Sequence, residues 1–298
     1  MMTNSLRPPT FGFVEADWLA NNLHQENLLI LDSTTNIVAN ENHEEKIVPE
    51  WDVFQANHIP TAQFLDLQGV LSDQSSPFNF MLPNTDQFEQ VLRQFGINQN
   101  SIVVIYSSGN PWWATRIWWM FRHFGLDNAY VLNGGLRYWQ QLGLPVEQGS
   151  PSKRAKGNIT ITSPRQLAID GDTLKQRLGE PGLTLINALP NDKFTGINSV
   201  HGGRPGHIPG SINVPAASLI DKDTGLFLKP EAIAKILNYH QLLEKNNEII
   251  AYCGGGISAS LIVFALALFN QNNVKLYDAS LSEWAHREDF PLHVTDTL

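Results

Sequence analysis

The sequence has a single cysteine, little basic charge and no long hydrophobic run. One cysteine among 298 residues cannot form an intrachain disulfide, so nothing in the chain requires an oxidising compartment. The formal net charge is −9, and Lys153, Arg154 and Lys156 form only a small isolated cluster, which argues against nucleic-acid binding. The longest apolar run, Leu261 to Phe269, has nine residues, whereas a helix that spans a bilayer needs about 20. The first residues also lack the pattern of a signal peptide, so a cytoplasmic protein without a membrane partner is expected.

Motifs that bind metals and nucleotides are missing as well. Nine histidines and one cysteine form neither an HExxH pair nor paired CxxC motifs, which makes a zinc site an unfavourable interpretation. The one glycine-rich loop lacks the Lys-Ser/Thr ending of a P-loop and the spacing of a dinucleotide fingerprint. We therefore expect chemistry that uses no metal and no organic cofactor.

The chain contains an internal repeat, and this is its most informative feature. Four segments of the first half return in the same order in the second half, between 145 and 155 residues later. The repeated pairs are NLLILDS with LTLINA, HIP at 58–60 with HIP at 207–209, SIVVIYSS with NEIIAYCG, and AYVLNGGLRYW with VKLYDASLSEW. Two homologous domains are predicted, at 10–147 and 158–298. The Gly-, Pro- and Lys-rich stretch between them, 148–157, is the predicted linker.

Each half alternates short apolar strands with helical stretches. The segments LLILD, SIVVIY and AYVLN in the first half, and LTLIN, NEIIAY and VKLYD in the second, are apolar without alternation. Such runs are typical of strands covered on both faces, as in a parallel sheet. The predicted fold class is therefore α/β, with two tandem domains that are each a mainly parallel sheet flanked by helices.

The residues after the strand NEIIAY form the candidate active site. Ligands of parallel α/β sheets bind beyond the carboxyl ends of the strands, where Cys253 lies. Gly254, Gly255 and Gly256 follow it, and Ile257 and Ser258 lead into an apolar helix. A glycine-rich turn lets several backbone amides point at one centre, and the helix N-terminus adds its positive dipole end. This setting stabilises a thiolate or a persulfide anion.

Two other interpretations of this loop were weighed. A free cysteine is often only a small buried core residue. A cysteine-based phosphatase needs a cationic side chain at the end of a similar loop, but Ala259 stands where an arginine would be expected. The phosphatase interpretation is therefore rejected. In the first domain Ser107 takes the place of the cysteine, which indicates a domain without turnover of its own.

At this point the chain resembles the rhodanese family, and specifically its tandem-domain thiosulfate and 3-mercaptopyruvate sulfurtransferases. The resemblance implies that Cys253 takes sulfur from a small-molecule donor as a persulfide and passes it to cyanide or a thiol. Protein sulfur donors or acceptors would be further partners. The motifs that carry the resemblance are GHIPGSINVP, CGGGISA and the segment from YD to SEW in the second half, with SSPFNFMLP, ATRIWWMFRHFG and VLNGGLRYW in the first.

The resemblance leaves the donor open. Thiosulfate-preferring members carry basic residues directly after the cysteine, whereas the small neutral loop here is closer to the mercaptopyruvate branch. That branch uses a serine two residues after the cysteine, where this chain has Gly255, together with a histidine matched here to His58. Family arginines that anchor the donor carboxylate correspond to Lys193 and to a second position, for which Arg204 and His201 are candidates. A carrier module that only receives and delivers a persulfide is the alternative.

Three further expectations concern residues around the site. Ser258 is expected to cap the helix that follows the cysteine loop or to donate to the persulfide, and capping alone would explain it. The polar stretch 41–50 is expected to be an exposed excursion with no ligand. Trp118, Trp119 and Phe121 are expected to pack in the core and between the domains.

Overall fold

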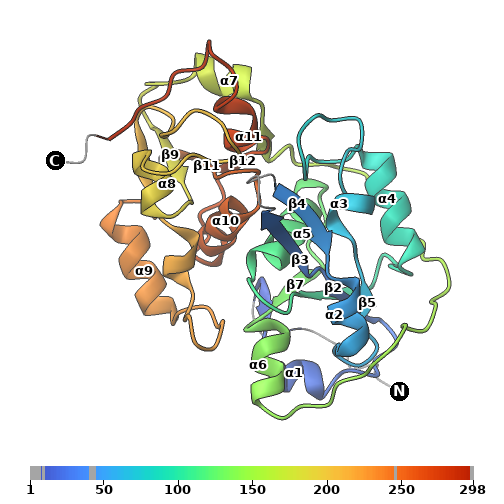
Figure 1. Ribbon diagram of the computed structural model, residues 1–298. Coiled ribbons are helices and arrows are strands. Elements are labelled where there is room, and N and C mark those ends of the chain that lie inside the picture. The colour runs from blue at the N-terminus through green and yellow to red at the C-terminus, as the bar shows by residue number, and fades with distance from the viewer. Residues whose placement is uncertain (1–7, 9–10, 40–44, 245–246, 296–298) are drawn as a thin grey trace.

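Two five-stranded parallel sheets carry the fold, one in each half of the chain (Figure 1). The computed structural model describes residues 8, 11–39, 45–244 and 247–295. The first sheet has the order β1 (Phe13–Val14), β7 (Ala129–Leu132), β6 (Ile102–Tyr106), β2 (Leu28–Asp32) and β5 (Gln63–Phe64). The second has the order β10 (Ser211–Asn213), β9 (Leu183–Asn187), β11 (Glu248–Tyr252), β12 (Val274–Tyr277) and β8 (Ala168–Ile169).

Helices cover both faces of each sheet, as in other parallel α/β folds. The first domain contains α1 (Ala16–Ala20), α2 (Trp51–Ala56), α3 (Leu67–Val70), α4 (Thr85–Gln94), α5 (Trp112–His123) and α6 (Gly135–Gln141). The second contains α7 (Gly171–Gln176), α8 (Asn191–Thr195), the 3-10 helix η1 (Ala216–Leu219), α9 (Pro230–Tyr239), α10 (Ser258–Leu268) and α11 (Ser280–Trp284). An antiparallel hairpin of β3 (Thr35–Ala39) and β4 (Glu45–Pro49) stands outside the first sheet. No helix of the described ranges is long and apolar enough to cross a membrane.

The duplication inferred from the sequence is confirmed by the strand order. Read from the opposite edge, the second sheet runs β8, β12, β11, β9, β10, which repeats the first sheet strand for strand. The register repeats too, because Asp32 pairs with Tyr106 and Asn187 pairs with Tyr252. The predicted central strands are confirmed, and the fold class is α/β as expected.

The segment between the domains stays in contact with the first domain over more residues than the sequence suggested. Gly157 donates its amide to the Arg93 carbonyl, and the Arg93 Nε donates to the carbonyl of Ile159. The Arg165 amide donates to the His123 carbonyl in the same way. The chain therefore joins the second sheet only at β8, and the boundary at 158 stays a prediction.

Helices α5 and α10 form the centre of the contact between the domains. Residues 261–267 of α10 are apolar on every side, so the helix is buried between its own sheet and α5. The Trp118 and Phe264 rings meet edge to face at 4.8 Å, and the Thr115 and Ser260 hydroxyls lie 2.8 Å apart. Trp118, Trp119 and Phe121 are all buried, which confirms their expected place in the core.

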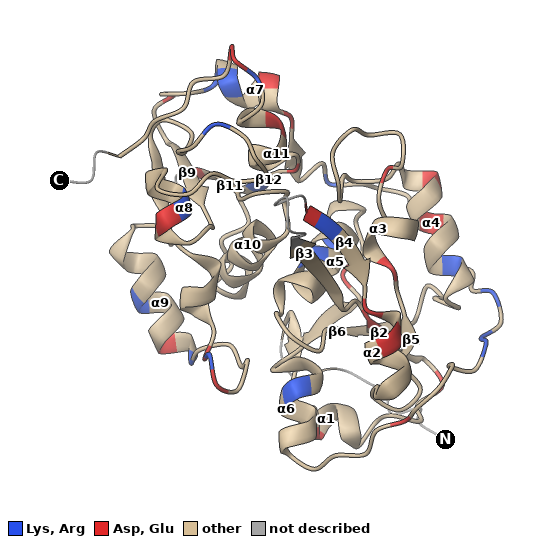
Figure 2. Cartoon of the chain, viewed as in Figure 1, with Lys and Arg blue, Asp and Glu red and all other residues tan. Residues whose placement is uncertain are grey.

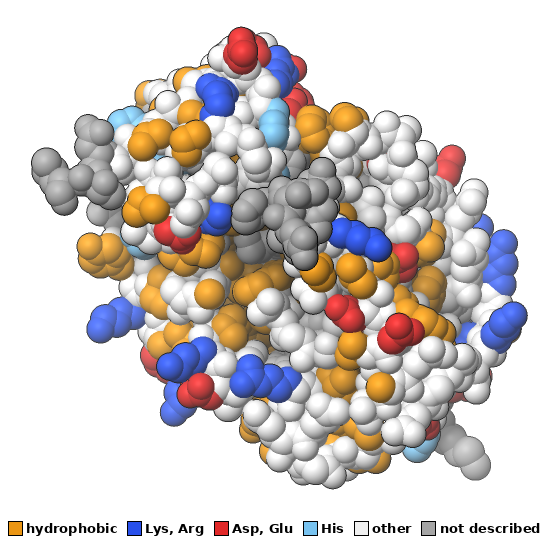
Figure 3. Space-filling view, in the orientation of Figure 1, with side chains coloured by type: hydrophobic (Ala, Val, Ile, Leu, Met, Phe, Trp, Pro, Cys, Tyr) orange, Lys and Arg blue, Asp and Glu red, His pale blue; other side chains and the backbone are white. Residues whose placement is uncertain are grey.

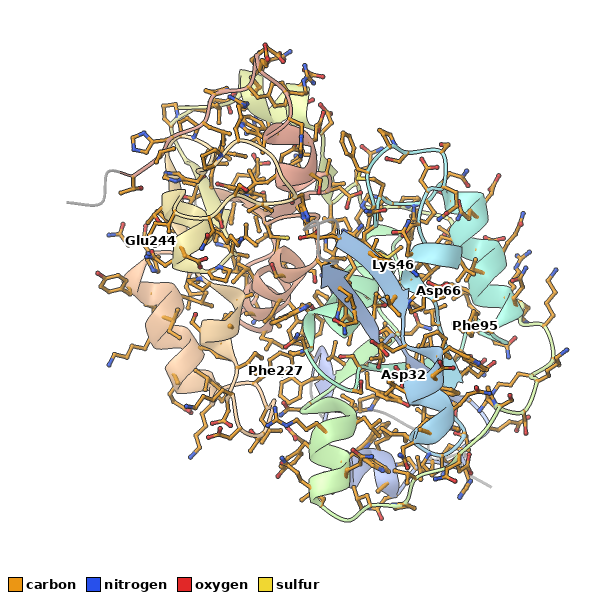
Figure 4. The ribbon with its side chains drawn as sticks, in the orientation of Figure 1. Asp32, Lys46, Asp66, Phe95, Phe227 and Glu244 are labelled. Carbon is orange, nitrogen blue, oxygen red and sulfur yellow. The ribbon has the colours of Figure 1, made fainter. Side chains whose placement is uncertain are left out.

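Each domain also extends a loop to the strand ends of the other. The Leu82 amide of the first domain donates to Asp278 Oδ2, directly after β12. In the reverse direction the Phe227 amide of the second domain donates to Asn133 Oδ1, directly after β7. Figure 4 shows Phe227 at the boundary between the domains. Asn133 and Asp278 occupy equivalent places in the two repeats, so the two contacts are related by pseudo-twofold symmetry.

On the face shown in Figure 3, basic side chains are scattered among other residues.

Candidate active site

Cys253 is held in the turn between β11 and α10 by the residues that follow β12. Its exposed fraction is 2%. The Cys253 amide donates to Ser280 Oγ at 3.0 Å, and its carbonyl accepts from the Leu281 amide at 3.1 Å. The Gly254 carbonyl accepts from both the amide and the hydroxyl of Ser282, at 2.7 and 2.9 Å. The start of α11 thus fixes the loop through its carbonyl groups.

The amides of this loop remain available for a ligand. From Gly254 to Ser258, no backbone N–H donates to an acceptor within the part of the chain that the structure describes. Ser258 is the first residue of α10, so these donors coincide with the positive end of an eleven-residue helix. Five unpaired amides next to a sulfur atom are suited to holding a negatively charged sulfur or sulfur–oxygen group.

The surroundings of the three glycines differ, and so does the effect that a side chain would have at each position. Gly256 has φ +74°, and a Cβ there would lie 2.6 Å from the Asp278 carbonyl oxygen. A Cβ on Gly254 would lie 2.7 Å from His201 Nε2. Gly255 has more room, because the nearest atom to such a Cβ is Ser282 Oγ at 3.4 Å. Backbone conformation and contact with a carbonyl oxygen therefore require glycine at 256, whereas a Cβ at 254 would meet a side chain and one at 255 has room.

Arg116 of α5, in the first domain, contacts the cysteine loop of the second domain. Its side chain has an exposed fraction of 0%, and its Nη1 lies 2.6 Å from Asp278 Oδ1. The guanidinium also donates to the carbonyls of Gly256 and Phe80 and lies 4.7 Å from the centre of the Trp119 ring. One buried cation thus connects the loop after β12, the cysteine loop and a loop of the first domain. A buried charge of this kind is tolerated only when it is paired.

His201 comes closest to the cysteine loop among the proposed substrate-binding positions. Its Nε2 faces Gly254, as the packing of that glycine shows, and its Nδ1 is hydrogen-bonded to Glu45 of the first domain. Glu45 begins β4, whose first residues lie at the domain boundary in Figure 2. The stretch 41–50 is therefore not a plain excursion, because 45–49 is a paired strand. Residues 41–44 lie outside the described ranges.

Arg204 and Lys193 have other partners. The Arg204 guanidinium donates to four backbone carbonyls, those of Trp284, Ala285, Arg287 and Phe290. These bonds use Nε and Nη2 and tie the C-terminal segment to the turn before β10. Lys193 Nζ donates to the Ser199 carbonyl at 2.8 Å. Substrate binding by Lys193 stays a prediction, and for Arg204 the contacts favour a structural role.

His58 lies in the core of the first domain and not at the cysteine loop. Its Nδ1 is bonded to the Phe54 carbonyl, and the two rings stack at 4.1 Å. His207 repeats this arrangement in the second domain, stacked on Phe194 at 3.8 Å with Nδ1 bonded to its carbonyl. The two histidines thus have the same structural role in the two repeats, packing against a phenylalanine ring and bonding to its backbone carbonyl. The first-domain side chain near Gly255 is Phe80, whose Cδ2 would be 4.0 Å from a Cβ there.

One detail of the cysteine loop differs from the sequence expectation. The predicted cap at Ser258 is wrong: Ile257 is the N-cap, no side chain caps the helix, and the Ser260 hydroxyl donates to the Ile257 carbonyl. In the first domain, Ser107 donates its hydroxyl to the Asn110 carbonyl. Trp112 and Trp113 line a hollow of about 480 Å³ at that domain's own strand ends.

Asp32 and Asn187 mark one chemical difference between the two halves. They end equivalent strands and are both buried. Burial raises the pKa of Asp32 to about 6, although the Thr34 amide and hydroxyl both donate to its Oδ1 and favour the ionised form. The second domain, which contains Cys253, has a neutral amide at this position at the end of β9.

Sequence reasoning missed Arg116, Asp278, Phe80 and Glu45. The signal for Arg116 was a lone arginine among the aromatic and aliphatic residues of ATRIWWMF. The other three lie more than 150 residues from their partners across the interface, as with Glu45 and His201 at a separation of 156. No local pattern reports contacts of that kind.

Comparison with known proteins gives consistent matches. The family model of the rhodanese-like domain matches residues 15–142 and 170–287. The 3-mercaptopyruvate sulfurtransferase of Escherichia coli K12 is 32% identical over 285 residues, which is 95% of this chain and 98% of that protein. The thiosulfate sulfurtransferase of Gallus gallus is 30% identical over 82% of this chain and 83% of its own length. The crystal structure of SseA from Escherichia coli, described as a 3-mercaptopyruvate sulfotransferase, superposes with a TM-score of 0.79 at 31% identity and covers 92% of this chain and 100% of that chain.

Proposed function

The chain belongs to the rhodanese family of sulfurtransferases, and from that premise we propose that Cys253 carries the transferred sulfur as a persulfide. The observation that carries the proposal is the lone cysteine directly after β11, followed by five amides, up to the first residue of α10, that donate to no acceptor in the described part of the chain. These donors favour both the attacking thiolate and the persulfide anion that replaces it.

The reaction has two half-steps. The Cys253 thiolate attacks the outer sulfur of the donor and forms an S–S bond. With thiosulfate the original S–S bond breaks and sulfite leaves. With 3-mercaptopyruvate the C–S bond breaks, and the leaving enolate becomes pyruvate when its carbon takes up the proton that the donor thiol has lost. Cyanide or a thiol then attacks the terminal sulfur, which forms thiocyanate or a new persulfide and returns the Cys253 thiolate.

The burial of the sulfur supports a small donor. With Cys253 exposed to only 2%, a small donor has less to insert than a protein-bound persulfide, which must bring a second chain to bonding distance. The neutral loop favours the opposite candidate, a carrier that accepts sulfur from a partner protein. Steady turnover with small donors alone would exclude the carrier. A cytoplasmic location and protein partners stay predictions of the sequence.

Intact-mass spectrometry tests the proposal directly. Incubation with thiosulfate or mercaptopyruvate should add the mass of one sulfur atom, and cyanide should remove it again. The Cys253→Ser protein is the matched control, because it keeps the fold and the size of the side chain but lacks the nucleophile. If neither donor adds sulfur to the unmodified protein, or if Cys253→Ser turns over equally well, the proposal is wrong.

A further inference from the structure

A histidine–carboxylate pair from both domains lies beside the cysteine loop. His201 of the second domain is bonded through Nδ1 to Glu45, at the start of β4 in the first domain (Figure 2). Its other nitrogen, Nε2, faces the backbone of Gly254, the residue directly after Cys253. Within the described ranges this nitrogen has no hydrogen-bond partner. The side chain is 28% exposed, so the imidazole is in contact with both solvent and the loop.

The backbone at His201 is held in an unfavourable conformation. His201 has φ +50°, a left-handed conformation that costs a residue with a side chain about 1 kcal/mol. Gly202 continues the turn with φ +70°, and the Gly203 amide donates to the Val200 carbonyl. Strained non-glycine residues concentrate at functional sites, where the strain fixes the direction of a side chain. Here the turn and Glu45 together direct Nε2 at the cysteine loop.

The two sulfur donors make different demands on such a group. Thiosulfate releases sulfite without any proton transfer. Mercaptopyruvate must lose its thiol proton and gain one at the methylene carbon of the leaving enolate. Within the described part of the loop, Gly254 to Ile257 offer no acid or base, and the nearby first-domain side chain is the apolar Phe80. The reaction with mercaptopyruvate therefore needs a proton carrier from elsewhere.

We propose that His201 Nε2 takes the thiol proton of mercaptopyruvate and returns it to the enolate carbon of pyruvate, with Glu45 as its positioning residue. The step balances: the C–S bond breaks, the S–S bond to Cys253 forms, and one proton moves from sulfur to carbon through the imidazole. This inference deepens the proposed function and rests on it. In the turn that follows His201, the Arg204 guanidinium donates to backbone carbonyls, and His286 Nε2 packs near Gly203.

The test compares both donors in one variant. General acid–base groups contribute about 10²- to 10⁴-fold, so His201→Gln should lower kcat/KM for mercaptopyruvate by about 100-fold or more. For thiosulfate the loss should stay below about fivefold, the effect of a partly exposed charge. His286→Gln is the matched control, an exposed histidine of the same region with no carboxylate partner in the described residues, and it should leave both values unchanged.

Glu45→Gln supplies a readout that a purely structural role would not change. The carboxylate orients the ring through Nδ1, so Glu45→Gln should lower kcat/KM for mercaptopyruvate and leave the value for thiosulfate nearly unchanged. Glu45→Asp, which keeps the carboxylate, should restore part of the loss. Equal losses with both donors would make His201 an anion anchor and overturn the proposal, as would no loss with either. Persulfide formation with thiosulfate but none with mercaptopyruvate in the unmodified protein would also overturn it, while leaving sulfur transfer through Cys253 intact.

Discussion

The buried ion pair between Arg116 and Asp278 gives the sharpest test of how the two domains hold the active site. In Asp278→Asn the carboxylate becomes a neutral amide of nearly the same shape, and Arg116 loses its only anionic partner among the described residues. Removing one member of a buried pair costs about 3–5 kcal/mol, because the remaining charge stays out of water without compensation. With a slope of about 2 kcal/mol per M in urea, the unfolding midpoint should fall by about 2 M.

Urea titrations followed by tryptophan fluorescence measure this change. Asp127→Asn is the matched control, since Asp127 is paired with Arg165 and Arg122 but its side chain is 54% exposed. That pair should contribute about 1 kcal/mol or less. Adding Arg116→Met to Asp278→Asn should recover part of the loss, because the second change removes the uncompensated charge. Equal midpoints for Asp278→Asn and Asp127→Asn would refute the reasoning.

Three more predictions follow from single residues. Because burial raises the pKa of Asp32 from 3.8 to about 6, the protonated carboxyl favours the fold at low pH, and stability should fall by up to about 3 kcal/mol as the pH rises from 4 to above 6. Asp32→Asn, which copies the amide of Asn187, should abolish that fall in urea midpoints taken at pH 4.5 and 8; an unchanged fall would contradict it. Gly256→Ala should lower the free energy of unfolding by about 2 kcal/mol and slow persulfide formation in a mass-spectrometric time course. Gly255→Ala should do neither. Equal effects of the two substitutions would show that the positive φ and the packing of Gly256 do not fix the loop. Arg204→Met should cost about 2–3 kcal/mol in the same urea titration through its lost carbonyl bonds, with no change in KM for thiosulfate, and a raised KM at unchanged stability would instead make it an anion-binding residue.

The sequence predicted the parts of the fold that are covered on both faces. Central strands such as β2, β6 and β11 are continuous apolar runs because helices bury them from two sides. Edge strands β5 and β8 have two residues each, too few for a periodic pattern. The hairpin of β3 and β4 was not predicted, because the composition of this stretch is typical of an exposed loop. Its strands form by pairing with each other.

The same division holds in the active site. Cys253 and its glycines are contiguous, so local chemistry identified them. The contacts of Arg116 with Asp278 and of Glu45 with His201 join residues 162 and 156 positions apart, and they exist only once the domains are packed. His58 was misleading for a related reason: its HIP motif is repeated for packing, and a repeated motif resembles a functional one when only its letters are compared.

The exchanged loops around Leu82 and Phe227 have a consequence for how this chain can vary. Each half closes the strand ends of its twin, so neither half is a spare copy, although only one contains the nucleophile. An insertion in the loop before α4 would disturb the contact with Asp278, which packs against Gly256 of the cysteine loop in the opposite half of the molecule. The two halves thus resemble the subunits of a dimer joined in one chain, in which a change to either half alters the strand ends of the other.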